Sequence, residues 1–258
     1  MKKYVNLFVF VFMVGACFSQ GKAQTKSAVS YKNPVVDIAM PDPTVIKAAD
    51  GYFYMYATES TRNVPIMKSK DLVQWTYCNT AFTNKTRPRF EPKAGIWAPD
   101  INYINNKYVL YYAMSVWGGE QTCGIGVATA DSPQGPFTDH GKMFRSNEIG
   151  VQNSIDPSFL QYEGRNYLVW GSFRGIYVIE LTEDGLSLKP GAEKKRIAGT
   201  AFEAAYIHKH GDYYYMFASI GSCCEGIRST YKVVVGRSKK GWGPYKDKSG
   251  KPMLKNGY

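Results

Sequence analysis

Short runs rich in Tyr, Val, Ile and Phe recur along the chain from about residue 34, and Gly, Asn, Asp and Pro interrupt them. This alternation predicts strands joined by tight turns, and no long stretch shows the 3.6-residue period of an amphipathic helix. The connections 49–51, 105–106 and 210–212 contain Gly, Asn and Asp, which tolerate the positive φ angles of hairpin turns. The pattern therefore predicts an all-β fold assembled from hairpins.

One unit occurs four times in this pattern. In each copy a carboxylate opens a short apolar run and an aromatic-rich strand follows; the carboxylates are Asp42, Asp100, Asp156 and Glu203, at intervals of 47 to 58 residues. A third strand and an outer edge strand are expected in the segments 66–75, 125–137, 176–181 and 233–245. Four strands per repeat are typical of a β-propeller blade, so four blades are predicted. A sandwich or barrel of short strands is the alternative, but it does not explain the recurring acid.

The innermost strand of each propeller blade lines the central channel, so carboxylates at the starts of equivalent strands are expected to converge at one end. Clustered carboxylates oppose one another's ionisation, which separates their pKa values and yields one usable acid and one usable base. Paired carboxylates beside aromatic rings suit glycoside hydrolysis. The candidate rings are Trp97, Trp117, Phe173 and Tyr206.

Simpler interpretations exist for both residue types. Aromatic side chains commonly fill protein cores, and Asp at the start of a strand commonly caps local backbone amides. The capping role fits Asp100, to which a structural role is assigned. It fits Glu203 poorly, because Glu is a poor turn residue.

The chain has 258 residues, 44% of them hydrophobic and 15% aromatic, which is enough for one large all-β domain. Its net charge is +11, but Lys and Arg are scattered and form no basic stripe, so no nucleic-acid partner is predicted. Attraction to an acidic pectic polysaccharide remains an alternative use of the charge. No His or Cys spacing resembles a zinc site.

Residues 1–23 have the layout of a signal peptide: Lys2 and Lys3, then an apolar run, then a polar stretch. The segment 14–17 resembles a lipoprotein box ending at Cys17, whereas 21–23 suits ordinary cleavage. Both alternatives predict export, to the periplasm, the cell surface or the medium, and the first adds a lipid anchor as the only link to a membrane. Residues 24–33 are expected to form a linker and residues 34–258 the propeller domain.

Four cysteines follow the signal, and the sequence does not choose among their pairings. Cys223 and Cys224 are neighbours, and adjacent cysteines rarely bridge without strain. A buried loop near the rim of the active site is expected there instead.

Several motifs in a fixed order give the chain a resemblance to a known family. They are Asp42-Pro-Thr-Val-Ile46, Trp97-Ala-Pro-Asp-Ile101, Ser154-Ile-Asp-Pro-Ser158, Gly171-Ser-Phe173, Phe202-Glu-Ala-Ala-Tyr206 and the segment 223–238. From about residue 33 onward the chain resembles glycoside hydrolase family 43, and most closely its arabinan endo-1,5-α-L-arabinosidase members.

The resemblance implies an inverting hydrolase with a general base at Asp42 and a general acid at Glu203. Asp156 would be the third carboxylate, which modulates the pKa of the acid and orients it. The implied substrate-binding residues are Trp97, Trp117, Asn153, Ser172 and Phe173. The implied substrate is arabinan of plant cell walls.

The resemblance also implies a five-bladed propeller, of which about four blades are recognisable in this chain. The complete family fold has a calcium ion at the channel centre, held with the help of a histidine in the fifth blade. None of His140, His208 and His210 matches that position, so no metal ligand is assigned. The expectation is a chain incomplete at its C-terminus, either a fragment of a longer reading frame or an inactive product.

Two alternatives to endo-arabinanase activity stay open. One is an exo-acting α-L-arabinofuranosidase or β-xylosidase of the same family, although no insertion long enough to close one end of a groove is visible. The other is a propeller that binds glycan without cleaving it. The presence of all three acids argues against this second alternative, and the absent blade argues for it.

Overall fold

The computed structural model describes residues 30–255. The predicted signal peptide, Cys17 and most of the predicted linker lie outside the described residues. The residues from Asn33 onward form one compact unit. Its elements are β1 (Thr44–Lys47), β2 (Phe53–Tyr56), β3 (Pro65–Ser69), β4 (Thr76–Thr80), β5 (Gly95–Ile104), β6 (Lys107–Ser115), β7 (Gly124–Ala130), β8 (Thr138–Arg145), α1 (Ser146–Ile149), β9 (Ser158–Tyr162), β10 (Arg165–Trp170), β11 (Ile176–Glu180), β12 (Lys195–Ala198), β13 (Glu203–His210), β14 (Tyr213–Ile220), η1 (Gly226–Arg228) and β15 (Lys232–Ser238).

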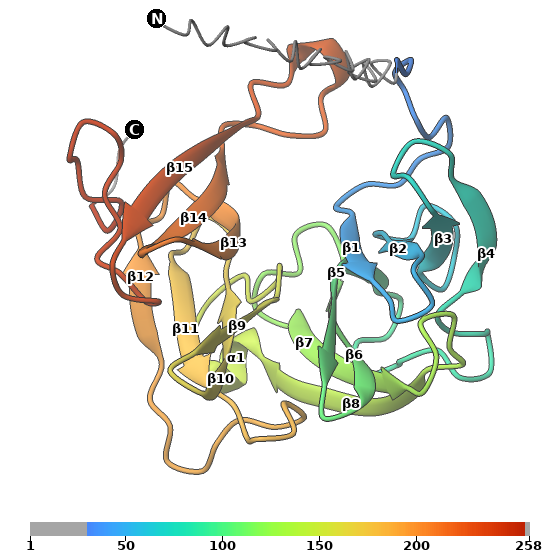
Figure 1. Ribbon diagram of the computed structural model, residues 1–258. Coiled ribbons are helices and arrows are strands. Elements are labelled where there is room, and N and C mark those ends of the chain that lie inside the picture. Colours follow the sequence, from blue (N-terminus) through green and yellow to red (C-terminus); the bar gives the residue numbers. More distant parts are fainter. Residues whose placement is uncertain (1–29, 256–258) are drawn as a thin grey trace, which may run out of the picture. The chain divides into compact units, whose positions relative to one another are not determined.

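The strands form four antiparallel sheets within residues 30–255, each with its strands in chain order. We call them blade 1 (β1–β4), blade 2 (β5–β8), blade 3 (β9–β12) and blade 4 (β13–β15). The innermost strands β1, β5, β9 and β13 face a common centre, and the last strand of each sheet lies at the periphery (Figure 1). This arrangement confirms the predicted propeller architecture.

Blade 4 differs from the prediction of four strands per repeat. After β15 only isolated bridges continue the sheet, one between Arg237 and Lys246 and one between Lys246 and Pro252. The predicted edge strand at 243–245 is not formed: Pro244 has no N–H to donate to a ladder, and Tyr245 is buried.

The hairpin turns between the first two strands of the blades lie at one end of the sheets. Positive φ angles occur at Gly51, at Asn105 and Asn106, and at Gly211, as expected from the turn residues. A two-residue turn such as Asn105-Asn106 needs positive φ at both positions, which asparagine tolerates better than other residues with a side chain.

The core lies between neighbouring blades, because the middle strands are buried on both faces. Along β6, Leu110 and Tyr112 pack toward blade 1, whereas Val109 and Tyr111 pack toward blade 3. Side chains alternate along β10 in the same way, so that its two faces contact blades 2 and 4. This double burial explains why these strands appear in the sequence as almost continuous apolar runs.

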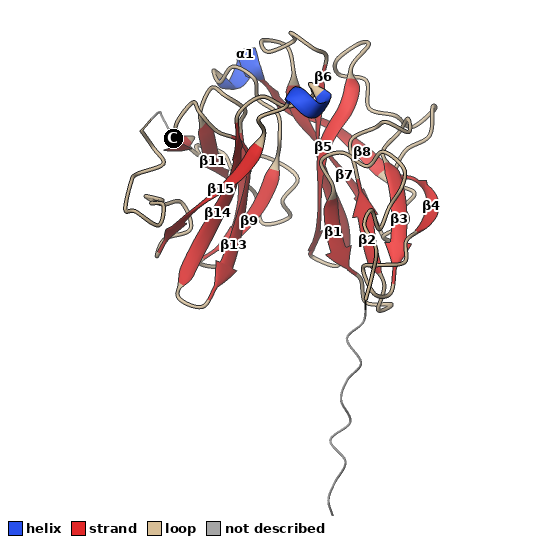
Figure 2. Ribbon diagram, turned by 90° about the horizontal axis from the view of Figure 1, so that it is seen from above, coloured by secondary structure: helices blue, strands red, loops and turns tan. Residues whose placement is uncertain are grey.

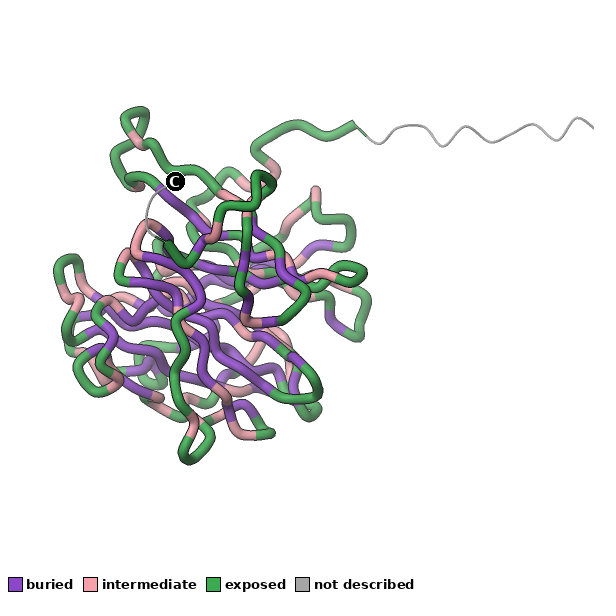
Figure 3. The backbone as a smooth tube through the Cα atoms, turned by 90° about the vertical axis from the view of Figure 1, so that its left-hand side faces the viewer, coloured by how far each residue is buried: buried purple, intermediate pink, exposed green. Residues whose placement is uncertain are grey.

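The face of blade 4 that points away from blade 3 is less covered. Phe217, Val233 and Val235 are exposed on it, at 37%, 63% and 40% of their surface. Buried segments follow the strands and exposed segments follow the loops (Figure 3). Strands dominate the regular structure (Figure 2), and in the part of the chain that the structure describes no helix is long and apolar enough to span a membrane.

Candidate active site

Three of the predicted acids lie at the same end of the innermost strands. Asp42 precedes β1, Asp156 precedes β9, and Glu203 is the first residue of β13, so all three are at the end opposite the hairpin turns. Asp156 interacts electrostatically with both other carboxylates. The structure therefore brings the three acids together.

Their surroundings differ. Glu203 is buried, Asp156 is partly buried and Asp42 is exposed. Burial raises the pKa of Asp156 well above its usual value, and the charges of Glu203 and Asp42 raise it further, while the N–H of Ala204 opposes this rise. A cluster of carboxylates with unlike environments is the arrangement that divides acid and base roles.

Glu203 is held by a chain of hydrogen bonds from blade 3. The Ser172 hydroxyl donates to Glu203 Oε2 at 2.6 Å, and the Asn153 amide donates to Ser172 Oγ at 2.9 Å. A β-bridge also pairs Ser172 with Glu203. Asn153 and Ser172, predicted as substrate-binding residues, thus lie against the buried acid.

Tyr231, which sequence reasoning missed, also contacts the acid. Burial raises the pKa of its phenol, and its interaction with Glu203 adds to the rise. The residue lies in the long connection between β14 and β15. It falls within the motif 223–238, but nothing in that motif distinguishes it as a contact of the acid.

Asp42 has a partner that sequence reasoning missed as well. The Thr58 hydroxyl donates to Asp42 Oδ2 at 2.5 Å, and Thr58 Oγ1 accepts a hydrogen bond from the N–H of Ala98 at 2.7 Å. Thr58 follows the buried strand β2, and nothing in its sequence context distinguishes it from an ordinary loop threonine.

The predicted aromatic residues differ in exposure. Trp97 in β5 and Trp117 in the loop after β6 have ring centroids 5.6 Å apart, and Trp117 is 80% exposed. Phe173 directly follows Ser172, and Tyr206 lies on an exposed face of β13, three residues after Glu203. Exposed aromatic faces of this kind suit stacking on sugar rings.

Several residues at this end adopt left-handed backbone angles that non-glycine residues rarely adopt. They are Asp42 (φ 50°), Ala98 (φ 40°), Asn153 (φ 56°), Asp156 (φ 58°), Phe173 (φ 51°) and Ala204 (φ 50°). Such conformations are unfavourable by about 1–3 kcal/mol each, and they concentrate at functional sites.

Asp100 does not belong to the cluster at the strand ends. In blade 2 the left-handed residue before proline is Ala98, the counterpart of Asp42 and Asp156, so Asp100 lies two residues further along, within β5. Aligning Asp100 with the other acids was therefore wrong by two residues, because the turn is marked by the proline and not by the carboxylate.

Asp100 has a structural environment instead. Its buried carboxylate accepts hydrogen bonds from Thr44 Oγ1 of β1 at 3.4 Å and from the N–H of Phe159 in β9 at 2.7 Å. One side chain thus connects blades 1, 2 and 3. Burial raises the pKa of Asp100 to about 6, although these bonds and one from Asn102 oppose the rise.

The expectation for the adjacent cysteines was wrong in that they are bridged and their loop is exposed, although the loop does lie near the acids, since Tyr231 at its end contacts Glu203. Cys223 and Cys224 form a disulfide, and their loop is largely exposed, with Ile227 fully exposed. The loop extends beyond the ends of β14 and β15, where no neighbouring sheet covers it, and Cys224 takes a left-handed conformation (φ 68°). Cys78 and Cys123 are free thiols.

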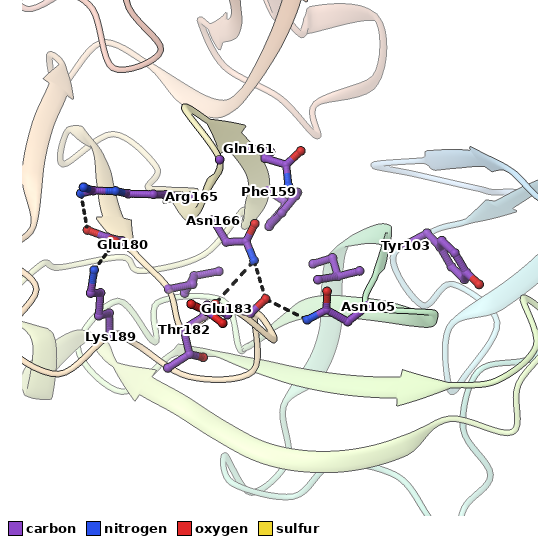
Figure 4. Close-up of a pocket in the computed structure, with 13 residues that line it drawn as sticks. Tyr103, Asn105, Phe159, Gln161, Arg165, Asn166, Glu180, Thr182, Glu183 and Lys189 are labelled. Carbon is purple, nitrogen blue, oxygen red and sulfur yellow. Dashed lines mark hydrogen bonds and ion pairs between the residues drawn. The ribbon is translucent and has the colours of Figure 1, made fainter.

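A hollow of about 710 Å³ lies at the other end of the strands (Figure 4). Its lining comes from blades 2 and 3 and includes Tyr103, Asn105, Gln161, Asn166 and Thr182. None of the three acids lines it. This hollow is therefore separate from the carboxylate cluster.

The calcium ion implied by the family resemblance stays a prediction for the complete family fold. Across residues 30–255 no group of three or more His, Cys, Asp and Glu side chains is arranged to hold a metal ion. His140 bonds to Thr129 in blade 2, and His208 lies on an exposed position of β13.

A propeller that carries a buried, a partly buried and an exposed carboxylate at one end, beside tryptophan rings, defines a glycosidase of the general acid–base type. The sequence profile described as glycosyl hydrolases family 43 matches residues 31–257. The chain belongs to this family.

Its relatives include enzymes with two modes of action. The extracellular endo-α-(1→5)-L-arabinanase 1 of Bacillus subtilis is 39% identical over 84% of this chain and 70% of its own length. The extracellular exo-α-(1→5)-L-arabinofuranosidase of Cellvibrio japonicus is 34% identical over 84% of this chain and 69% of its own length. Among solved structures, the α-L-arabinanase of Cellvibrio cellulosa has a TM-score of 0.77 at 32% identity, covering 84% of this chain and 76% of that one.

Proposed function

We propose that this glycosidase hydrolyses internal α-1,5 links of arabinan with inversion at the anomeric carbon. The observation that carries the proposal is the cluster of Asp42, Asp156 and Glu203 in unlike environments at one end of the propeller. Relatives named as endo-arabinanases support the substrate, and one solved relative, 32% identical, is an arabinanase in complex with arabinohexaose.

The roles follow from exposure and charge. Asp42 is exposed and reaches solvent, so it is the base that takes a proton from water while the water oxygen bonds to the anomeric carbon. Glu203 is buried, and it donates its proton to the departing glycosidic oxygen as that bond breaks. Asp156 is the third carboxylate, which modulates and orients the acid; its electrostatic interaction with Glu203 and the bond that it accepts from the N–H of Ala204 support this role.

Substrate contacts are assigned to the same end. Trp97 and Trp117 offer adjacent rings for stacking, and Phe173 lies next to the Ser172 that bonds the acid. Asn153 positions Ser172, so its effect on substrate is exerted through that hydroxyl. A calcium ion at the channel centre remains part of the proposal for the complete family fold only.

Export is proposed together with the activity. Relatives are named as extracellular enzymes, and the N-terminal sequence has the layout of a secretory signal. A lipid anchor at Cys17 is the finer proposal. Labelling with a radioactive fatty acid tests it, and a Cys17→Ala variant should lose the label and leave the membrane fraction.

Proton NMR of linear α-1,5-arabinan during hydrolysis by the full chain tests the reaction. Short oligosaccharides of several lengths, released first as the inverted anomer, are expected. Release of a single small product from chain ends would favour the exo-acting alternative. Binding to arabinan without any cleavage would favour the glycan-binding alternative and refute the hydrolase.

A further inference from the structure

Thr58 makes three hydrogen bonds that join the exposed acid to the neighbouring blade. Its hydroxyl donates to Asp42 Oδ2 at 2.5 Å and accepts the N–H of Ala98 at 2.7 Å. Its backbone N–H donates to the carbonyl of Pro41, next to Asp42, at 2.9 Å. One threonine therefore holds both the backbone and the side chain of this acid.

The direction of these bonds is fixed by their chemistry. A backbone N–H can only donate, so the bond from Ala98 uses a lone pair of the Thr58 oxygen. The single hydroxyl proton is then left for Asp42, whose Oδ2 must accept it. Within residues 30–255, the other oxygen, Oδ1, has no hydrogen bond from a side chain.

Asp42 has little else to hold it. Within residues 30–255, Thr58 is the one side chain that hydrogen-bonds its carboxylate, which is exposed and would otherwise rotate between rotamers. Asp42 and Ala98 both have left-handed backbone conformations, which are unfavourable in themselves. The bonds of Thr58 to these two residues help to hold those conformations.

We propose that Thr58 is the positioning residue for the general base, keeping Oδ2 of Asp42 occupied and Oδ1 directed at the attacking water. The same hydroxyl ties the base to Ala98, next to Trp97, and so links the geometry of the base to the backbone of an aromatic substrate contact. This inference rests on the proposed function, because Asp42 acts as a general base only if the protein hydrolyses glycosidic bonds.

Replacing Thr58 with valine keeps the shape and removes the hydroxyl. A misplaced base loses roughly 10- to 100-fold in rate, since small errors in the placement of reacting groups cost about that much. The expected result is a fall of that size in kcat with KM for arabino-oligosaccharides changed by less than about twofold. Thr58→Ser restores the hydroxyl and is expected to regain most of kcat.

A matched control is available far from the acids. Thr182 Oγ1 donates to Asp184 Oδ1 at 2.6 Å in an exposed loop at the hairpin end, so Thr182→Val removes the same kind of bond outside the site. Its kcat should equal that of the wild type. Circular dichroism and urea unfolding establish that each variant is folded under assay conditions.

A substrate with a good leaving group distinguishes a defect in the general base from a defect in the general acid. With a nitrophenyl arabino-oligosaccharide the leaving group needs no proton, so Glu203→Gln should recover much of its rate. Thr58→Val and Asp42→Asn should not recover, because attack by water still requires the base.

The outcomes are distinct. Inverting cleavage by the wild type together with unchanged kcat in Thr58→Val would overturn the positioning role alone. So would a loss in Thr58→Val that serine does not repair, or one that the nitrophenyl substrate removes. A folded wild-type protein that cleaves neither substrate would overturn the proposed function, and with it this inference.

Discussion

Replacing Asp100 with asparagine changes a single atom in a buried contact shared by three blades. The carboxylate accepts bonds from Thr44, Asn102 and Phe159, and its burial raises its pKa to about 6. Asparagine has nearly the same shape but no charge at any pH. The substitution therefore isolates the contribution of this ionisation to stability.

The sign follows from comparing folded and unfolded states. An unfolded chain has an aspartate pKa of about 3.9, which is below the value of about 6 in the fold. The folded state therefore binds the proton more tightly, so this stabilising contribution is fully present below about pH 3.9 and is lost as pH rises through about 6. The difference between the two values corresponds to roughly 3 kcal/mol.

Urea unfolding between pH 4 and pH 7 measures this contribution. The free energy of unfolding of the wild type should fall relative to that of Asp100→Asn by roughly 2 kcal/mol across the range, because at pH 4 about half of the unfolded carboxyl groups have already lost the proton. Other groups, including Asp156, titrate in both proteins and cancel in the difference. The bond geometry that asparagine disturbs adds an offset that does not depend on pH.

The exposed Asp131 provides a control, because its side chain is 85% accessible and Asp131→Asn should leave the pH dependence as it is in the wild type. Parallel curves for the wild type and Asp100→Asn would refute the reasoning, since they would mean that Asp100 takes up no proton preferentially in the folded state.

Three further predictions concern the acids, a ring and a buried ion pair. Glu203→Gln and Asp42→Asn should each lower kcat on arabinan by roughly 10²–10⁴-fold with unchanged circular dichroism, and substantial activity in either folded variant would contradict its role. Trp117→Ala should raise KM for arabinan roughly three- to tenfold with little change in kcat, because it removes an exposed stacking surface; an unchanged KM would exclude it from substrate binding. Arg87→Met should cost roughly 3–5 kcal/mol in urea unfolding, because it leaves the buried Glu59 carboxylate without its ion-pair partner; a loss below about 1 kcal/mol would show that the site relaxes or admits water.

The repeat and the strands could be predicted from the sequence, because each depends on local patterns. Apolar runs buried on both faces and turn residues with positive φ, such as Asn105 and Asn106, leave a direct trace in the chain. The alignment of the four repeats with one another failed at Asp100, because an acid and a proline occur close together there. Only the backbone angles show that Ala98 is the turn position.

Contacts between blades left no such trace. Thr58 lies 16 residues from Asp42 of blade 1 and 40 from Ala98 of blade 2, so its bonds depend on the fold of blade 1 and on how the two sheets pack, and not on any spacing. Tyr231 and Glu203 lie 28 residues apart within blade 4, and their contact likewise depends on the folded sheet and not on spacing. The bridge between Cys223 and Cys224 was not predicted, because adjacent cysteines rarely bridge without strain. In the structure Cys224 takes a left-handed conformation, which cysteine rarely adopts.

The separation of the acids from the hairpin turns has a practical consequence for engineering. Turns such as Asn105-Asn106 and Gly211-Asp212 lie at the far end of the strands whose near ends bear the acids, and they are exposed. Exposed loop tips are where insertions are tolerated best. An affinity tag, a fluorophore or a carbohydrate-binding module could be joined there. The added group would then lie at one end of the propeller while the acids act on the polymer at the other.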